Sequence, residues 1–336
     1  MAPRPNRLLG TALVLVTLLT GCSSRLADAP PPAVEPIGPA VSPPVSVAPA
    51  GDVTALPGGP QGALFDPATS TLAVFTGGPA AALTLLGATG AARTVRLPGP
   101  AWAIAGDGAG TVYASARGGV FAADLAAGAV RFTGVAGEND TDFTAIARRA
   151  DGRLVLGSAD GTAYTLAADM TVSRRVDVFD RVDAIVAVGD RAIVLDRSQT
   201  SVTALNTDGA PQQALRAGLG ATSMTADPAG RVLVTDTRGG QLLVFSVDPL
   251  IERQAYPVAG SPFGLAGSAT WAWVSLTATN TVVGYDLATG IPVEKVRYPT
   301  VQQPDSMAFD EQTRTLYVVS GSGGGVQVIT DAGGRA

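Results

Sequence analysis

Carboxylate and amide side chains gather in three short stretches of a sequence that is otherwise poor in reactive groups. The candidate set consists of Glu138, Asn139, Asp140, Asp142, Asp180, Asp183 and Asp305. Oxygen atoms of this kind are the ligands that hard cations such as Ca²⁺ take in number. If the fold brings the three stretches together, they predict a rim that binds a metal ion or a polar ligand. The alternative, which the abundance of acidic residues in turns favours, is that these side chains cap turns and hydrate loops.

The residue types that the chain lacks narrow its chemistry further. It contains no histidine and a single cysteine, so the commonest general base is missing and no internal disulfide can form. A Ser-His-Asp triad is excluded for the same reason. The glycine-rich stretch 321–325 lies between two apolar stretches and precedes no helix, which argues against a phosphate-binding loop. We therefore predict no catalytic residue and no cofactor, and the balance is against an enzyme.

The charge of the chain argues against nucleic acid as a partner. There are 23 basic and 28 acidic residues, which gives a net charge of −5, and the basic residues form no clustered run. Phosphate backbones are bound by clustered Lys and Arg side chains. We therefore expect no nucleic-acid partner.

The N-terminus has the organisation of a bacterial secretory signal. Arg4 and Arg7 precede an uncharged apolar stretch over residues 8–20, which is shorter than the roughly 20 residues that span a bilayer as a helix. The tetrapeptide that follows, LTGC ending at Cys22, resembles a lipobox, in which the chain is cut before a lipid-bearing cysteine. An incidental cysteine after a plain signal peptide is the alternative. We predict a signal peptide over residues 1–21 and a lipid on Cys22, which places the protein at the cell membrane on its extracytoplasmic face.

The next segment, residues 22–51, is rich in Pro, Ala, Ser and Val and has no periodicity. This composition is typical of an extended, partly polyproline tether. We expect the tether to pack against nothing, so that deletion of residues 23–51 costs little stability. A docking site for a proline-recognition module is the alternative, but no P-x-x-P stretch has flanking basic residues.

From residue 60 onward one pattern of about 40 residues recurs seven times. Each copy has the pattern of four short strands, and the second strand of each is very apolar. The centres of these second strands fall at residues 73, 113, 155, 193, 233, 273 and 317. Pairs such as Asp151-Gly152 and Asp227-Pro228 predict tight turns before several of them. Seven four-stranded repeats predict an all-β, seven-bladed β-propeller over residues 52–336.

The two ends of the repeat region complement each other. The seventh repeat begins near Asp305 and has only three strands before the chain ends. An unassigned strand over residues 52–58 precedes the first repeat, and its Leu-Pro-Gly ending matches that of residues 97–99. We predict that this N-terminal strand completes the last blade, with Thr54 near Val328, because closure removes two unpaired strand edges.

Several repeats resemble known propeller families. Residues 273–286 (WVSLTATNTVVGYD) and 316–320 (LYVVS) resemble the YVTN-type repeat, and residues 233–236 (LVTD) resemble the NHL type. The whole is similar to the propeller lipoproteins of high-GC Gram-positive (actinobacterial) bacteria. Such families share an architecture and no single activity, so the resemblance implies a fold and no catalytic residue.

Two functions remain open. The first is a lipid-anchored, extracytoplasmic binding or scaffolding module for a protein or another cell-envelope ligand, and Trp102, near the channel, is a candidate contact. Trp273 is expected in the blade core. The second is a metal-dependent, lactonase-like hydrolase that uses the acidic set at the channel mouth. Gluconolactonase-like propellers hold a divalent ion with Glu, Asn and Asp residues from different blades, whereas here residues 138–140 are consecutive on one loop.

Overall fold

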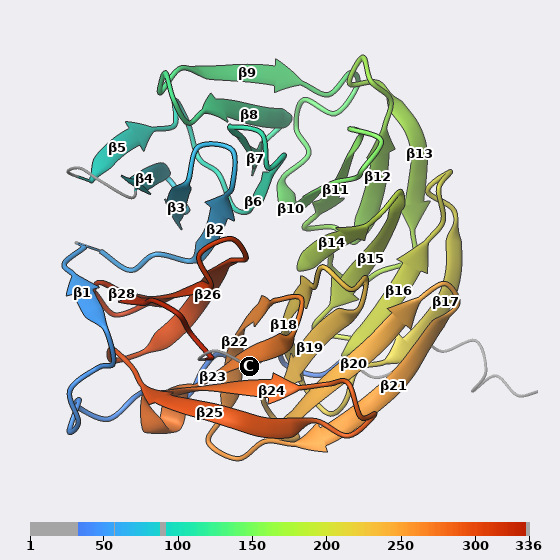
Figure 1. The fold of residues 1–336 in the computed structure, drawn as a ribbon. Coiled ribbons are helices and arrows are strands. Elements are labelled where there is room, and N and C mark those ends of the chain that lie inside the picture. Colours follow the sequence, from blue (N-terminus) through green and yellow to red (C-terminus); the bar gives the residue numbers. More distant parts are fainter. Residues whose placement is uncertain (1–32, 57, 88–91, 334–336) are drawn as a thin grey trace, which may run out of the picture. The chain divides into compact units, whose positions relative to one another are not determined.

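A computed structural model of the chain describes residues 33–56, 58–87 and 92–333. Cys22 and the predicted signal peptide lie outside the described residues. The 28 strands of the described chain form seven four-stranded antiparallel sheets, arranged as the blades of a ring (Figure 1). The predicted seven-bladed β-propeller is therefore confirmed. No helix within the described residues is long and apolar enough to cross a membrane.

Each blade runs outward from a first strand near the axis of the ring to a fourth strand at its rim (Figure 1). Blades 1 and 2 contain β2 (Gly62–Asp66), β3 (Thr71–Thr76), β4 (Ala82–Gly87), β5 (Arg93–Arg96), β6 (Ile104–Gly106), β7 (Thr111–Ala116), β8 (Gly119–Asp124) and β9 (Val130–Gly134). Blades 3 and 4 contain β10 (Phe143–Arg148), β11 (Leu154–Ser158), β12 (Thr162–Leu166), β13 (Val172–Asp177), β14 (Ala184–Val188), β15 (Arg191–Asp196), β16 (Ser201–Leu205) and β17 (Pro211–Arg216).

The remaining blades complete the ring. Blades 5 and 6 contain β18 (Ala221–Ala226), β19 (Val232–Asp236), β20 (Gln241–Val247), β21 (Leu250–Pro257), β22 (Pro262–Gly267), β23 (Trp271–Leu276), β24 (Thr281–Asp286) and β25 (Val293–Pro299). Blade 7 contains β26 (Pro304–Asp310), β27 (Thr315–Ser320), β28 (Val326–Ile329) and β1 (Asp52–Thr54). One 3-10 helix, Thr277–Thr279, lies between β23 and β24.

The core is divided among the junctions between blades. Apolar residues form seven clusters, and each cluster joins one pair of neighbouring blades. The second and third strands together supply most of the buried apolar residues, because they are covered by a blade on each side; Trp273 in β23 is 0% exposed, as expected for blade core. Burial of apolar surface between all seven pairs is what stabilises a ring of separate sheets.

The N-terminal strand closes the ring as predicted, but in a different register. β1 pairs antiparallel with β28, with Thr54 opposite Val326 and Asp52 opposite Val328. The predicted proximity of Thr54 and Val328 is therefore displaced by two residues, and β1 ends at Thr54 instead of continuing to residue 58. The buried side chain of Gln327 fixes this register, because its Nε2 donates to the carbonyl of Ala50 at 2.7 Å.

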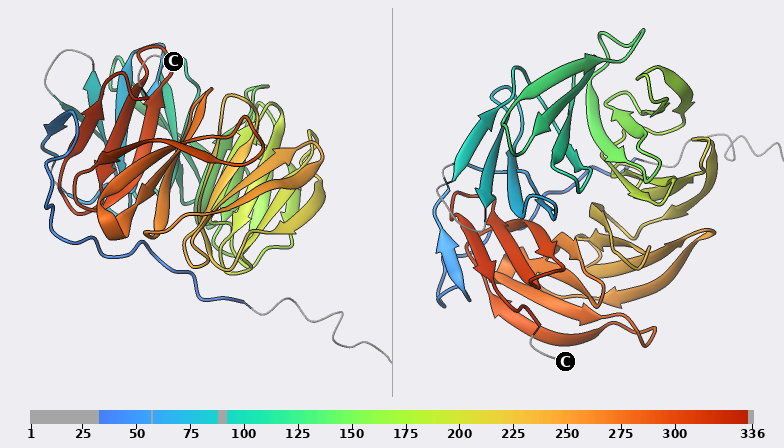
Figure 2. Two further views of the ribbon diagram at one scale, coloured as in Figure 1. Left: turned by 60° about the horizontal axis from the view of Figure 1, so that its bottom comes forward. Right: turned by 45° about the horizontal axis from the view of Figure 1, so that its top comes forward.

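The tether was expected to pack against nothing, and for residues 33–51 this expectation is wrong. We call these residues the N-terminal segment; they run along one face of the ring (Figure 2). Ser42 is only 4% exposed, and its hydroxyl donates to the carbonyl of Thr277 at 2.5 Å. A segment without periodicity can still dock, because extended proline-rich chain satisfies its carbonyls with partners outside itself.

Candidate functional site

The topology brings two kinds of connection to one face of the ring. Because the four strands of a blade alternate in direction, this face carries each connection from a fourth strand to the next first strand, and each connection from a second to a third strand. We call it the mouth face. The residues that begin each first strand therefore lie around the axis of the ring at this face, where side chains from different blades can meet.

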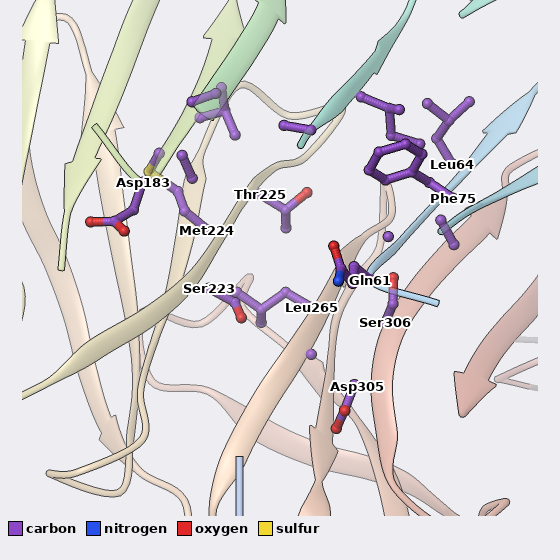
Figure 3. A pocket seen from close by; sticks show the side chains of 18 of the residues that line it. Gln61, Leu64, Phe75, Asp183, Ser223, Met224, Thr225, Leu265, Asp305 and Ser306 are labelled. Atoms are coloured by element: carbon purple, nitrogen blue, oxygen red, sulfur yellow. The ribbon is translucent and has the colours of Figure 1, made fainter. Parts of the chain in front are cut away.

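A central cavity of about 470 Å³ opens among the first strands and is lined by residues of all seven blades (Figure 3). Its size lies in the range of small-molecule sites, roughly 300–1,000 Å³. Polar residues occupy the beginnings of the first strands, and apolar residues follow further along. The polar group includes Gln61, Thr144, Asp183, Thr222 and Asp305, and the apolar group includes Leu64, Ile104, Ile185, Leu265 and Met307.

Asp183 enters this cavity from blade 4. Its side chain is 12% exposed, and its Oδ2 accepts a hydrogen bond from the backbone N–H of Arg197 at 2.9 Å. Arg181 lies against the other oxygen, with Nε 3.1 Å from Oδ1. Burial raises the pKa of Asp183, and the hydrogen bond from Arg197 and the nearby guanidinium groups only partly oppose this shift.

Asp305 enters the cavity from blade 7. Burial raises the pKa of this carboxyl as well, and a hydrogen bond of 2.9 Å from Gln303 Nε2 to its Oδ1 opposes the shift. Figure 3 shows Asp183 and Asp305 on different sides of the cavity. The cavity thus brings together two members of the predicted acidic set, of which Asp183 is already paired with Arg181, whereas the hydrogen-bond partner of Asp305 is the neutral amide of Gln303.

The remaining members of the predicted set do not line the cavity. Glu138 is buried and forms an ion pair with Arg175, and it also accepts a 2.7 Å hydrogen bond from the hydroxyl of Thr141. Its loop, which joins blades 2 and 3, is therefore held together by Glu138 itself. This is the turn-stabilising role that the sequence left as the alternative.

The other members lie on the surface of the mouth face. Asp140 pairs with Arg117 at 3.0 Å, and its side chain is 93% exposed. Asn139 and Asp142 on the same loop are exposed, and Asp180 is exposed and accepts a hydrogen bond from Ser198. Within the described residues, no three His, Cys, Asp or Glu side chains gather closely enough to hold a metal ion.

Trp102 lines the cavity and is 43% exposed, so its predicted position near the channel agrees with the structure. The uncharged polar residues of the lining, such as Gln61, Thr144 and Thr222, were not predicted. These are ordinary residue types. Their position directly after each connection between blades was the only signal that could have identified them.

Two buried aspartates outside the predicted acidic set support the loops of the mouth face. Asp236, at the end of β19, is 0% exposed and accepts hydrogen bonds from the backbone N–H groups of Leu219, Gly220 and Gly239 at 2.8–2.9 Å. Asp196, at the end of β15, accepts a hydrogen bond from the backbone N–H of Asp180 at 2.7 Å in the same way. These carboxylates satisfy amides of the inter-blade connections, so they hold the loops that surround the cavity.

Comparisons with known proteins extend this description of the fold. The sequence matches no protein-family model and no curated protein. A solved structure of hydrazine synthase from Kuenenia stuttgartiensis is similar with a TM-score of 0.67, 13% identity, and coverage of 86% of this chain and 99% of that one.

Two lyase structures are similar to the same degree. A streptogramin B lyase has a TM-score of 0.68 and 12% identity, with coverage of 83% of this chain and 96% of that one. A catalytically inactive histidine-to-alanine variant of virginiamycin B lyase from Staphylococcus aureus, solved with quinupristin, has a TM-score of 0.67 and 12% identity, with coverage of 83% and 98%. Identities at this level show a shared seven-bladed propeller fold, which hosts several activities, and no more.

Proposed function

We propose that the protein is a ligand-binding propeller, anchored by lipid on Cys22 to the extracytoplasmic face of the cell membrane, whose ligand enters the central cavity from the mouth face. The observation that supports this most is the cavity itself, because all seven blades line it and two partly buried carboxyls open into it. A concave cavity whose walls combine apolar surface with a few polar groups is the default binding site of a fold.

The cavity walls suggest the chemical class of the ligand. The carboxylate of Asp305 favours a positive charge, and Asp183 adds a second carboxylate that Arg181 already pairs. Trp102 offers an aromatic face, and Leu64 and Leu265 offer apolar surface. A cation that lies between an aromatic ring and a carboxylate is attracted by the face of the ring and by the negative charge. We infer a small molecule, or a side chain of a protein ligand, that has a positive charge on an apolar body.

A lyase activity has less support than a ligand-binding function. The comparison includes a lyase that is inactive when one histidine is replaced by alanine, and the present chain has no histidine at all. The propeller of that lyase was solved with quinupristin. The present chain therefore lacks the residue type on which catalysis by that lyase depends, but it has a central cavity in which a ligand can bind.

A fragment screen tests the binding proposal. We expect benzylamine, a cation, to raise the melting temperature of the propeller more than benzyl alcohol or benzoate. The Asp183→Asn/Asp305→Asn double variant should lose this preference, because it removes both negative charges and keeps the side-chain shapes. Equal shifts for all three fragments, or an unchanged preference in the double variant, would overturn the proposal.

Two further measurements separate the parts of the proposal. Calorimetric titration with Ca²⁺, Mg²⁺, Mn²⁺ and Zn²⁺ tests the metal-dependent hydrolase, because tight stoichiometric binding of any of them would favour that alternative. Fractionation of cells that produce the Cys22→Ala variant tests the anchor. We expect released protein or uncleaved precursor, and a processed variant that stays in the membrane fraction would contradict lipidation.

A further inference from the structure

The N-terminal segment crosses the mouth face from blade 7 to blade 4. Starting from β1, its contacts pass to the mouth-face connections of successive blades. The backbone N–H of Val34 finally donates to the carbonyl of Ser198 in blade 4 at 2.7 Å. Figure 2 shows this path along one face of the ring. Chain that comes from the N-terminus therefore meets the propeller on the mouth face, and not at the rim where β1 lies.

Side chains of the propeller hold the backbone of this segment. Asn280 Nδ2 donates to the carbonyl of Pro43 at 2.8 Å, and Arg197 donates to the carbonyl of Ile37. Gln303 uses both ends of its amide, because Nε2 donates to the carbonyl of Ala40 and Oε1 accepts from the N–H of Ser42, each at 3.0 Å. Proline-rich chain loses little entropy on docking, so such contacts can hold it in place.

Docking changes how far the propeller can lie from the lipid. From Cys22 to Val34 there are 12 residues, which span at most about 40 Å when fully extended. From Cys22 to β1, 30 residues would span about 100 Å if the segment were free. Docking therefore reduces by more than half the greatest distance between Cys22 and the first residue that the propeller holds. It also places that residue on the mouth face.

The mouth face also gathers exposed apolar side chains. The N-terminal segment presents Val41, Val45 and Val47, which are 92%, 43% and 62% exposed. Val178 and Leu219, on connections between blades at the same face, are 66% and 57% exposed. These side chains, spread over several blades, add apolar surface to the face that the segment crosses.

Together these observations identify the partner of this surface. We infer that the mouth face lies against the lipid bilayer that carries the anchor, and that the docked N-terminal segment imposes this orientation. The inference rests on the lipid anchor of the proposed function. Its consequence is that the central cavity opens toward the membrane, so that its ligands come from the membrane surface or from molecules held there.

Energy transfer on vesicles tests the orientation. The chain from Cys22 onward has one thiol, which can be coupled to maleimide-phosphatidylethanolamine in phosphatidylcholine vesicles that contain rhodamine lipid. A donor dye is placed at one of two positions. Position 140 lies on the mouth face, after blade 2, and position 127 lies on the opposite face, between β8 and β9 of blade 2. We expect more transfer from position 140 than from position 127. Equal transfer from the two positions, or more from position 127, would overturn the inference.

A matched pair of variants tests the role of the segment. Ser42→Asp places a carboxylate against the carbonyl of Thr277 and should release the segment, so that the difference between the two dye positions is lost. Ser46→Asp, a change of the same type at an exposed position of the same segment, should keep the difference. If Ser42→Asp does not fold, Asn280→Ala removes a different contact and should have the same effect.

The outcomes remain distinct from those of the anchoring test. A difference that persists in a folded Ser42→Asp or Asn280→Ala protein would show that the segment does not orient the propeller. Because the lipid is attached chemically here, failure of lipidation in cells would appear only with Cys22→Ala and would leave this measurement unchanged.

Discussion

Gln303 donates a hydrogen bond from its Nε2 to Oδ1 of Asp305 at 2.9 Å, and the same nitrogen bonds the carbonyl of Ala40 at 3.0 Å. One amide thus joins a carboxyl of the central cavity to the N-terminal segment. Arg197 forms a second link through two different groups, because its backbone N–H donates to Asp183 and its guanidinium donates to the carbonyl of Ile37. The two residues that hold the backbone of the segment are therefore themselves bonded to the carboxyls of the cavity.

The raised pKa of Asp305 predicts a pH-dependent stability difference. Its pKa is higher in the folded than in the unfolded state, so its contribution is fully present below the unfolded pKa and is lost as the pH rises through the folded pKa. Asp305→Asn removes this loss and keeps an acceptor for Gln303. We therefore expect the variant to gain stability over the wild type between about pH 3 and about pH 7, measured by urea unfolding.

Asp140→Asn is the control for this measurement, because the side chain is 93% exposed. Its stability should stay within about 0.5 kcal/mol of the wild type at both pH values. If Asp305→Asn behaves like this control, then burial of Asp305 does not affect its ionisation.

Docking of the N-terminal segment predicts a stability loss where the free-tether interpretation predicted none. Ser42→Asp should lower the free energy of unfolding by about 1–3 kcal/mol, because it breaks a buried hydrogen bond and places a charge against a carbonyl. Ser46→Asp should change it by less than about 0.5 kcal/mol. Urea unfolding measures both, and equal effects of the two variants would show that the segment is not docked.

The closure register predicts which cysteine pairs cross-link. In a Cys22→Ala background, Thr54→Cys with Val326→Cys should oxidise readily, because opposed residues of antiparallel strands have Cα atoms about 4.5–5.5 Å apart. Thr54→Cys with Val328→Cys is offset by two residues and should oxidise poorly, since diagonal neighbours lie about 7–8 Å apart. Mass shifts after alkylation of free thiols measure both, and the reverse preference would contradict the register.

The buried carboxylate of Asp236 predicts a large structural effect away from the cavity. Asp236→Ala leaves three buried or partly buried N–H groups without their acceptor and should cost about 3 kcal/mol of unfolding free energy. Asp208→Ala, at an exposed turn, should cost less than about 0.5 kcal/mol. Thermal unfolding compares them, and a small effect of Asp236→Ala would mean that its loop has other support.

The ring and its number of blades follow from the pattern of residues along the chain. Apolar second strands recur at a spacing near 40 residues, and the ends of the repeat region supply three strands and one strand, so both the number of blades and the closure followed. Local pattern is sufficient here because every blade repeats the same burial between two neighbours. The exact register of β1 did not follow, because it depends on the Gln327 side chain and its contacts with chain far away in sequence.

Which polar residues share a site depends on how the folded ring brings distant blades together. Asp183 and Asp305 come from blades 4 and 7 and line one cavity from different sides, whereas Glu138 pairs with Arg175 of blade 3 and Asp140 with Arg117 of blade 2. The docked N-terminal segment was equally hidden, because its contacts are made between its backbone and side chains more than 150 residues away. Such contacts leave no periodic pattern, since a carbonyl group is present at every residue whatever its side chain.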